Sequence, residues 1–211
     1  QANKAAGTIK YASPFGFDAS AGILDVFAAQ KLGYFTDLCL NVEFVTHATN
    51  SSSLVSSNTA QVTNVGSAAD LMNGISHGAD LVGIATYGNV SNYAILTRPD
   101  ITKLSDLKGK NVAYHGVLPI VLRQMIQASG LSMNDISLVL SNSYDPNQLF
   151  ETDLGGLQAY RTNEPLVLSQ GGRKFNEFTP DQFGVQGTFN IQTVNGTFLK
   201  AHPDAVQDFL R

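Results

Sequence analysis

The chain has 211 residues, of which 43% are hydrophobic and 14% are charged, and its formal net charge is -4. This length allows a substantial core in one or two domains. Nucleic-acid binding is excluded, because no run of Lys and Arg is present to face a phosphate backbone. No apolar run approaches the ~20 residues that span a bilayer. Residues 1–7 lack the apolar segment of a signal peptide, although a removed signal or lipid anchor would leave no trace.

The single cysteine, Cys39, excludes an internal disulfide and a cysteine metal cluster. It stands in the apolar stretch Leu38–Leu40, so we expect it to be a buried core thiol. The four histidines are too dispersed along the chain to suggest a metal site. We therefore predict neither a metal nor a cofactor.

Two common catalytic motifs are missing. The only Gly-Lys pair, Gly109-Lys110, is followed by Asn111 rather than by Ser or Thr, which excludes a phosphate-binding loop of the GxxxxGK[ST] type. No serine has the flanking glycines of a GxSxG nucleophile elbow. These absences predict that the protein is not an enzyme.

Apolar periodicity predicts strands that alternate with helices. The first strand, Ile9–Ala12, runs into the loop SPFGFD, and the helix Ile23–Leu32 follows, with Gly33 at its left-handed end. Further strands are expected at Val42–Val45, Val62–Val65, Leu81–Thr86, Tyr93–Thr97, Asn111–Tyr114, Ile136–Leu140, Gly155–Tyr160, Arg173–Phe178 and Thr188–Val194. Further helices are expected at residues 50–57, Ala69–His77, Ile120–Ser129 and Pro146–Thr152, and from Pro165 and Ala205 onward.

This alternation predicts an α/β fold with two doubly wound β-α domains, because the pattern restarts after a change of character at Arg98 and Pro99. We expect domain I at residues 1–97 plus 188–211 and domain II at residues 98–187. Two strands, Tyr93–Thr97 and Thr188–Val194, would cross between them. In such folds ligands bind at the carboxyl ends of strands, so we expect an interdomain cleft there.

The stretch Gly155–Pro165 shows how such an edge is built. It passes from an apolar strand pattern to side-chain oxygens at Thr162, Asn163 and Glu164, just before a proline that suits the first turn of a helix. The residues alone favour a well-capped helix over a ligand site here, since helix caps are common. Several aromatic residues lie at the predicted edges and suit stacking on a flat ligand, but for any single one of them core packing is the favoured interpretation. The candidate ligand-binding residues at all edges are Phe15, Phe17, Asp18, Asn64, Gly66, Ser67, Tyr87, Tyr114, His115, Gly116, Tyr144, Tyr160, Arg161, Asn163 and Glu164.

Five segments in chain order carry a family pattern: residues 17–44, which include LGYFTDLCLNVEF, and residues 62–72, 101–116, 158–165 and 183–211. They resemble the periplasmic solute-binding proteins of ABC importers over nearly the whole chain. The resemblance implies a type II periplasmic-binding fold, a Venus flytrap of two domains. It also implies a small-molecule ligand, membrane permease subunits as partners, a monomer, and a periplasmic or extracellular location, with a lipoprotein anchor if the source is Gram-positive.

Within that superfamily the chain is most similar to the branch named after thiamine-pyrimidine synthesis, which includes binders of sulfonate, taurine, nitrate and riboflavin. The sequence TNEP at Thr162–Pro165 resembles members that handle pyrimidine-like or flavin-like compounds. We therefore expect a receptor for a small polar heteroaromatic ligand. A sulfonate, taurine or nitrate receptor of the same fold is the alternative.

A pyrimidine-synthesising enzyme, the activity of fungal relatives in this branch, is a further alternative. Those relatives carry a cysteine-rich signature that the lone Cys39 does not supply. A ligand-sensing domain fused to another module also stays open. Two features depart from the family pattern: the amphipathic helices expected after the second crossing are absent beyond Arg211, and ETDLGGLQAY replaces a Gly-x-x-Asp-Ala pattern.

Overall fold

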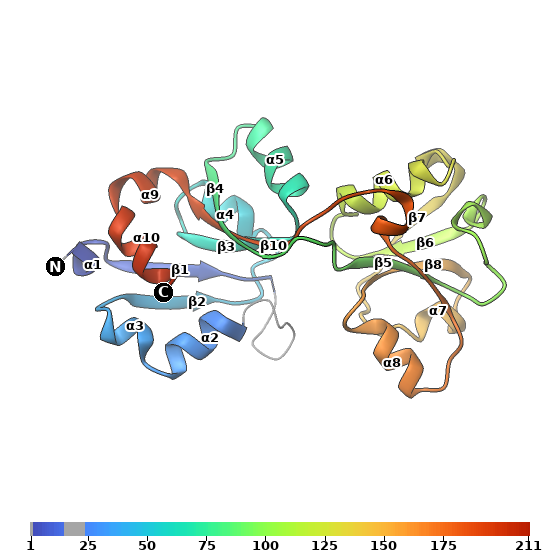
Figure 1. Cartoon of the computed structure of the whole chain (residues 1–211), viewed down its shortest axis with the longest axis horizontal. Helices are drawn as coiled ribbons and strands as arrows, with labels where there is room; N and C mark the ends of the chain where they lie inside the picture. Colours follow the sequence, from blue (N-terminus) through green and yellow to red (C-terminus); the bar gives the residue numbers. More distant parts are fainter. Residues whose placement is uncertain (1, 15–23) are drawn as a thin grey trace. The chain divides into compact units, whose positions relative to one another are not determined.

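The computed structural model describes residues 2–14 and 24–211, which form two compact units (Figure 1). The first unit comprises residues 1–87 and 190–211, and the second comprises residues 88–189. The helices are α1 (Ala2–Ala5), α2 (Leu24–Lys31), α3 (Tyr34–Asp37), α4 (Ser51–Ser56), α5 (Ala68–Ser76), α6 (Ile120–Ala128), α7 (Gln148–Glu151), α8 (Glu164–Gln170), α9 (Gly196–Ala201) and α10 (Pro203–Phe209). The strands are β1 (Thr8–Ala12), β2 (Asn41–Val45), β3 (Val62–Val65), β4 (Leu81–Gly88), β5 (Tyr93–Thr97), β6 (Asn111–Tyr114), β7 (Ser137–Leu140), β8 (Leu154–Tyr160), β9 (Asn176–Phe178) and β10 (Phe189–Asn195).

Each unit is built on a five-stranded sheet. The first sheet has the order β2-β1-β3-β10-β4 and the second the order β7-β6-β8-β5-β9. In each sheet three neighbouring strands are parallel and the fourth is antiparallel, β10 in the first sheet and β5 in the second. The two sheets therefore share one topology, and the predicted α/β class is confirmed.

Helices cover both faces of each sheet, as a doubly wound fold requires. In the first unit, Tyr11 packs with Val26 and Phe209 on one face, while Val55 and Leu71 belong to a cluster on the other. In the second unit, α6 contributes to one buried cluster and α7 and α8 contribute to another. Buried side chains between the helices and each sheet therefore fix the positions of β1, β3, β6 and β8.

The chain passes from the first unit to the second at Tyr87–Gly88, earlier than the expected boundary at residue 97. The reason is that β5, which was assigned to the first domain, pairs with β8 and β9 in the second sheet. All five residues of β5 are buried. A fully buried run of this kind fits an interior position in either sheet, so its sequence does not tell which one it joins.

Cys39 was expected to be buried, and this prediction is wrong, because its side chain is exposed. It follows α3 with a φ of 57°, in the left-handed conformation that closes a helix end. The N–H groups of Cys39 and Leu40 donate to the carbonyls of Thr36 and Phe35. That turn buries Leu40 and directs the thiol outward.

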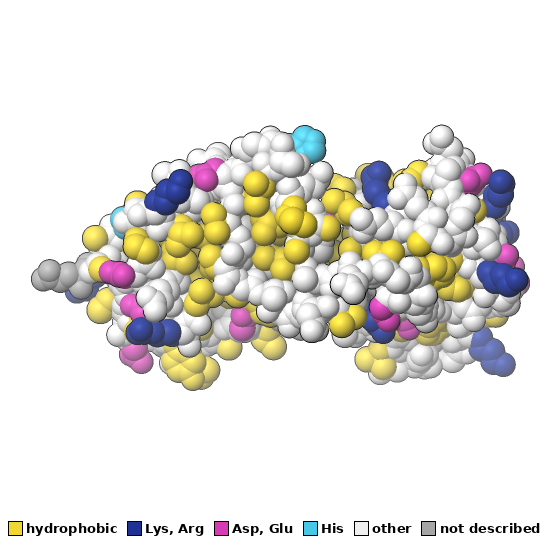
Figure 2. All heavy atoms as spheres, turned by 45° about the horizontal axis from the view of Figure 1, so that its top comes forward, with side chains coloured by type: hydrophobic (Ala, Val, Ile, Leu, Met, Phe, Trp, Pro, Cys, Tyr) yellow, Lys and Arg dark blue, Asp and Glu magenta, His cyan; other side chains and the backbone are white. Residues whose placement is uncertain are grey.

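Charged residues make up 14% of the chain. On the face that Figure 2 presents, charged side chains are sparse, and hydrophobic side chains lie among uncharged ones. Met72 and Val82 are among the exposed apolar residues of the first unit.

Candidate functional site

In the first unit, the edge after β3 carries three of the predicted residues, Asn64, Gly66 and Ser67. Ser67 is fully buried and caps α5: its Oγ accepts a hydrogen bond from the Asp70 N–H at 3.2 Å and donates one to Asp70 Oδ2 at 2.5 Å. Both the donor and an acceptor site of this hydroxyl are therefore used by the helix start. The contacts of Ser67 favour a structural role over ligand contact.

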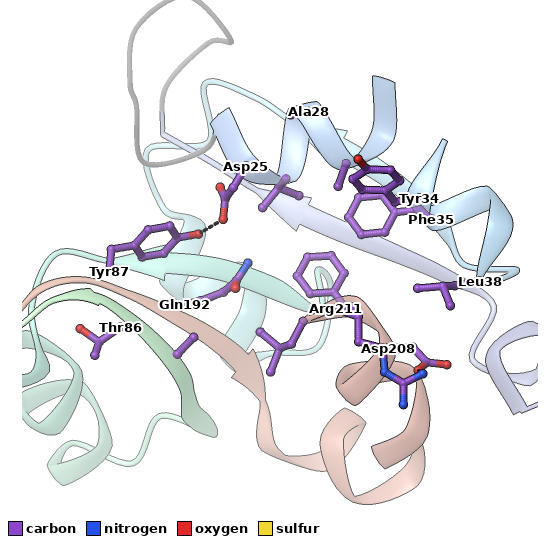
Figure 3. A pocket seen from close by; sticks show the side chains of 15 residues that line it. Asp25, Ala28, Tyr34, Phe35, Leu38, Thr86, Tyr87, Gln192, Asp208 and Arg211 are labelled. Carbon is purple, nitrogen blue, oxygen red and sulfur yellow. Dashed lines mark hydrogen bonds and ion pairs between the residues drawn. The ribbon is translucent and has the colours of Figure 1, made fainter. Parts of the chain in front are cut away.

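Three side chains from three elements form a hydrogen-bonded chain at the same edge. Tyr87 of β4 donates its hydroxyl to Asp25 Oδ2 of α2 at 2.6 Å (Figure 3). Asn64 of β3 makes a hydrogen bond to Tyr87. Burial raises the pKa of Tyr87, and the hydrogen bond to Asp25 raises it further. The phenol therefore stays protonated and keeps donating to the carboxylate.

Asp25, which lines a cavity and bonds Tyr87, was not among the residues predicted from the sequence. It lies in the first turn of α2, where a carboxylate is favoured by the partial positive charge of the helix end. The apolar spacing of ILDVFAAQ indicated only a core-facing helix. The pairing with Tyr87 spans 62 positions in the sequence, so no local pattern could have shown it.

Asp25 and Tyr87 line one end of a cavity of about 370 Å³ within the first unit (Figure 3). Gln192 of β10 lines it beside them, and Phe35 and Leu38 are among its apolar walls. The cavity is within the size range of small-molecule sites. Asp208 and Arg211, which form an ion pair at 3.0 Å, also line it.

Two predicted residues of the second unit stack on each other at the carboxyl end of its sheet. The rings of His115 and Tyr144 have centroids 4.5 Å apart and an interplanar angle of 25°. His115 Nδ1 lies 3.0 Å from the carbonyl oxygen of Ser141, so a proton on Nδ1 makes that bond. In the neutral ring, Nε2 is then left as an acceptor. Gly116 follows with a φ of 59°, which turns the chain directly after this histidine.

Tyr160 and Glu164 form a second group at this edge. Glu164 is 3% exposed, and its Oε2 accepts the Tyr160 backbone N–H at 2.7 Å. The ring of Tyr160 lies 5.2 Å from that of Tyr93, and burial raises the pKa of its hydroxyl. Asn163 is the residue before α8, but its side chain makes no capping bond. Glu164 therefore ties the start of α8 back to the end of β8.

Arg161 is occupied by neighbouring carboxylates. Its Nη1 lies 3.1 Å from Asp181 Oδ1 and its Nε lies 3.7 Å from Glu177 Oε1. The side chain is 35% exposed, so these pairs are partly screened by solvent. Burial raises the pKa of Glu177, and the Arg161 charge opposes that rise. One guanidinium thus faces two acids and carries no spare positive charge for an anion.

A family model described as NMT1/THI5 like matches residues 21–211. The chain belongs to the NMT1/THI5-like family. A search of curated protein sequences finds no match.

Solved structures similar to this NMT1/THI5-like chain include three from different organisms. The alkanesulfonate-binding protein SsuA of Xanthomonas axonopodis, solved with MOPS, is 19% identical with a TM-score of 0.68, over 95% of this chain and 68% of that one. A putative periplasmic sulfonate-binding protein of Methylobacillus flagellatus is 18% identical with a TM-score of 0.68, over 96% and 66%. A Candida albicans protein with the generic periplasmic binding protein fold is 14% identical with a TM-score of 0.68, over 96% and 67%.

These similarities confirm the type II periplasmic-binding fold of the family member. The chain spans about two thirds of the length of the structures that it matches. Among residues 2–14 and 24–211, no helix is long and apolar enough to cross a membrane.

The structure of this NMT1/THI5-like chain brings the predicted residues together in groups within each unit. Tyr87 joins Asn64 in the first, while His115 joins Tyr144 and Tyr160 joins Glu164 in the second. Tyr114 ends β6 beside them and is half-buried. Phe15, Phe17 and Asp18 lie outside the described residues. In the described part of the chain, no group of three His, Cys, Asp or Glu side chains could hold a metal ion.

Proposed function

We propose that this chain is the extracytoplasmic solute-binding receptor of an ABC importer and that it captures a small polar heteroaromatic ligand, thiamine-pyrimidine-like or riboflavin-like. The receptor role is supported by the fold and by the printed names of relatives, which are binding proteins of ABC transporters. It implies permease subunits as membrane partners. The receptor releases its ligand unchanged, in line with the lack of the catalytic motifs considered above.

The ligand class rests on the charges around Arg161 and Glu164. Arg161, the one cation among the predicted binding residues, faces Asp181 and Glu177. Glu164 keeps a buried carboxylate at the same edge. A sulfonate or nitrate would meet this carboxylate without an unpaired cation to balance it. A ring that presents N–H donors suits Glu164, and the stacked His115 and Tyr144 offer an aromatic face.

The test is calorimetric titration of the full chain with pyrimidines, flavins, ethanesulfonate, taurine and nitrate. Glu164→Gln should weaken pyrimidine or flavin binding by about 1.5–3 kcal/mol, the range for hydrogen bonds to charged groups. The amide oxygen of Gln can still accept the Tyr160 N–H, so the melting temperature should change little. Glu151→Gln, an exposed change in α7, is the matched control.

Two outcomes would contradict the proposal. Tight binding of taurine or nitrate alone, unaffected by Glu164→Gln, would assign the chain to the anion receptors instead. Product formed from a bound pyrimidine, detected by mass spectrometry beyond a heat-treated control, would favour the enzyme alternative.

A further inference from the structure

Gln158 is a polar residue in the interior of a buried strand. It lies in β8, the central strand of the second sheet, whose residues Leu154–Ala159 are all buried. Its own exposed fraction is 4%. Burial of an amide costs stability unless its hydrogen bonds are made, so each polar atom of this side chain needs a partner. Gln158 was not among the ligand-binding residues predicted from the sequence.

The oxygen of this amide has its partner where the sheet pairing stops. The pairing of β6 with β8 ends at Ala113 and Leu157. Beyond it, the backbone N–H of His115 donates to Gln158 Oε1 at 3.3 Å. A backbone N–H can only donate, so the amide atom that faces it is the oxygen. This bond therefore fixes the orientation of the amide and leaves Nε2 as its other end.

The nitrogen of the same amide is not used within the protein. Across residues 2–14 and 24–211, Gln158 Nε2 makes no hydrogen bond. It does not belong to the fully enclosed unpaired atoms of these residues either, so it keeps access to solvent. A nearly buried glutamine thus holds its two N–H donors ready for a molecule from outside.

The place of Gln158 in the sheet is one where α/β proteins bind ligands. From β6 the chain passes through α6 to β7 on one side, and then through α7 to β8 on the other side of β6. β6 and β8 therefore flank the switch point of this sheet, and ligands bind outside the carboxyl ends of such strands. His115 directly follows β6, and Gln158 lies two residues before the end of β8.

His115 supplies the opposite hydrogen-bonding character at this edge. Its Nδ1 proton is used by the Ser141 carbonyl, so Nε2 of the neutral ring is an acceptor. The ring also stacks on Tyr144, which limits its rotation. Gln158 and His115, joined by one hydrogen bond, together offer a donor and an acceptor to a ring that binds here.

We infer that Gln158 is a specificity-determining residue, whose Nε2 donates a hydrogen bond to an acceptor atom of the ligand ring, a carbonyl oxygen or a ring nitrogen. This inference rests on the proposed function and adds a recognition residue in the same unit. Loss of one neutral hydrogen bond lowers affinity by about threefold to tenfold. An oxygen placed against the ligand acceptor lowers affinity further, because both acceptors are then left unpaired.

The experiment measures dissociation constants of the full chain for thymine, 2,5-dimethylpyrimidine and ethanesulfonate by calorimetry. Gln158→Glu keeps an oxygen for the His115 N–H and replaces the N–H donors by a second oxygen. At about pH 8 it should bind the pyrimidines at least about tenfold more weakly than the wild type. At about pH 5.5 this ratio should fall to about threefold, because burial raises the pKa of the new carboxyl and a protonated carboxyl donates. The wild type is measured at both pH values, so titration of His115 cancels in the ratio.

The two rings separate the two kinds of acceptor. Thymine presents carbonyl oxygens, whereas the only acceptors of 2,5-dimethylpyrimidine are its ring nitrogens. Weaker binding of thymine alone supports the inference with a carbonyl oxygen as the acceptor. Weaker binding of 2,5-dimethylpyrimidine supports it with a ring nitrogen. Binding of both rings that Gln158→Glu leaves unchanged at both pH values overturns the inference.

The control variant is Gln124→Glu, which makes the same chemical change at an exposed position of α6 in the same unit. It should keep the wild-type affinities at both pH values. If Gln158→Glu does not fold, Gln158→Met replaces it and should bind the pyrimidines about threefold to tenfold more weakly. Nitrogen NMR shifts of the His115 ring then report its tautomer. Weaker binding with unchanged shifts supports the inference, whereas unchanged affinity, or weaker binding with altered shifts, overturns it.

The two proposals fail in different ways. Pyrimidine binding that is the same in the wild type and the Gln158 variants overturns the role of Gln158 and leaves the receptor function standing. Saturable binding of ethanesulfonate with no binding of either pyrimidine overturns both. Absence of binding by all three probes also counts against both.

Discussion

At the scale of single residues, local hydrogen bonds lower the pKa of Asp135. Its Oδ2 accepts bonds from the Ser132 backbone N–H and hydroxyl, both at 2.8 Å, and its Oδ1 lies 3.2 Å from Lys108 Nζ. The backbone bond, followed by the hydroxyl and Lys108, lowers the pKa of Asp135 to about 2. The unfolded chain has the ordinary value near 3.8 and binds the proton more readily.

The stabilisation that Asp135 provides should therefore be present above about pH 4 and be lost as the pH falls toward 2. We predict that Asp135→Asn lowers the melting temperature at pH 7 and reduces the slope of melting temperature against pH between about 4 and 2. Thermal melting in pH steps measures both effects. Asp153→Asn, at an exposed loop position, is the control. An unchanged slope in Asp135→Asn would contradict the prediction.

Some properties of single residues could be predicted from the sequence and others could not. The left-handed conformation of Gly33 was predicted correctly, because a glycine that follows a helix commonly ends it in this way, and its φ is 83°. The pairing of Arg161 with Asp181 depends on a fold contact 20 positions away, so Arg161 was left as a cation available to a ligand. The partners of a charged side chain are set by tertiary structure. The ion pairs of Arg161 with Asp181 and Glu177 support the proposed ligand class.

At the scale of elements, the start of α9 depends on a glycine. Asp80 Oδ2 accepts bonds from the Thr197 N–H at 3.0 Å, the Thr197 hydroxyl at 2.8 Å and Asn195 Nδ2 at 3.2 Å. A Cβ on Gly196 would collide with the Asp80 carboxylate. Since three bonds hold that carboxylate in place, it cannot move away without loss.

We predict that Gly196→Ala destabilises the protein by about 1–3 kcal/mol, the usual cost of overpacking. Urea denaturation measures the free energy of unfolding. The matched control is Gly74→Ala in α5, where the nearest atoms to the new Cβ lie at 3.9 Å. It should be neutral or stabilising by about 0.4–1 kcal/mol, because Ala is favoured in a helix interior. Equal stability of the two variants would show that Asp80 is not fixed as described.

The longer elements were predictable, whereas of the short helices α4 and α7 were predicted and α3 and α9 were not. The β-α alternation predicted the parallel strands, and it predicted α5 and α6 because nine residues in each carry a periodic apolar face. The helix α2 was predicted as well, although its apolar residues do not gather on one side. The helices α3 and α9 have four and six residues and were missed. Their starts depend on single contacts, such as the bond from the Phe198 N–H to Asn195 Oδ1, that no periodicity reveals.

At the scale of the whole molecule, the sequence indicated two domains, but the exact course of the chain between them was settled by strand pairing. The buried clusters are each built from residues of one unit. Met125 is fully buried on α6 in one of the clusters of the second unit, with Leu122 and Ile136. Val55 is fully buried on α4 in one of the clusters of the first. This arrangement gives each unit its own source of stability.

We predict that Met125→Ala, which should cost about 2–5 kcal/mol, accelerates amide hydrogen exchange in β6 and β8 and leaves β1 and β2 near their wild-type rates. The reason is that exchange reports the free energy of the unit that opens. Val55→Ala should do the reverse. Hydrogen exchange followed by mass spectrometry on peptides from both sheets measures this directly. Equal acceleration of all four strands by either variant would mean that the two units unfold in one cooperative step, and the independence inferred from their separate cores would then be lost.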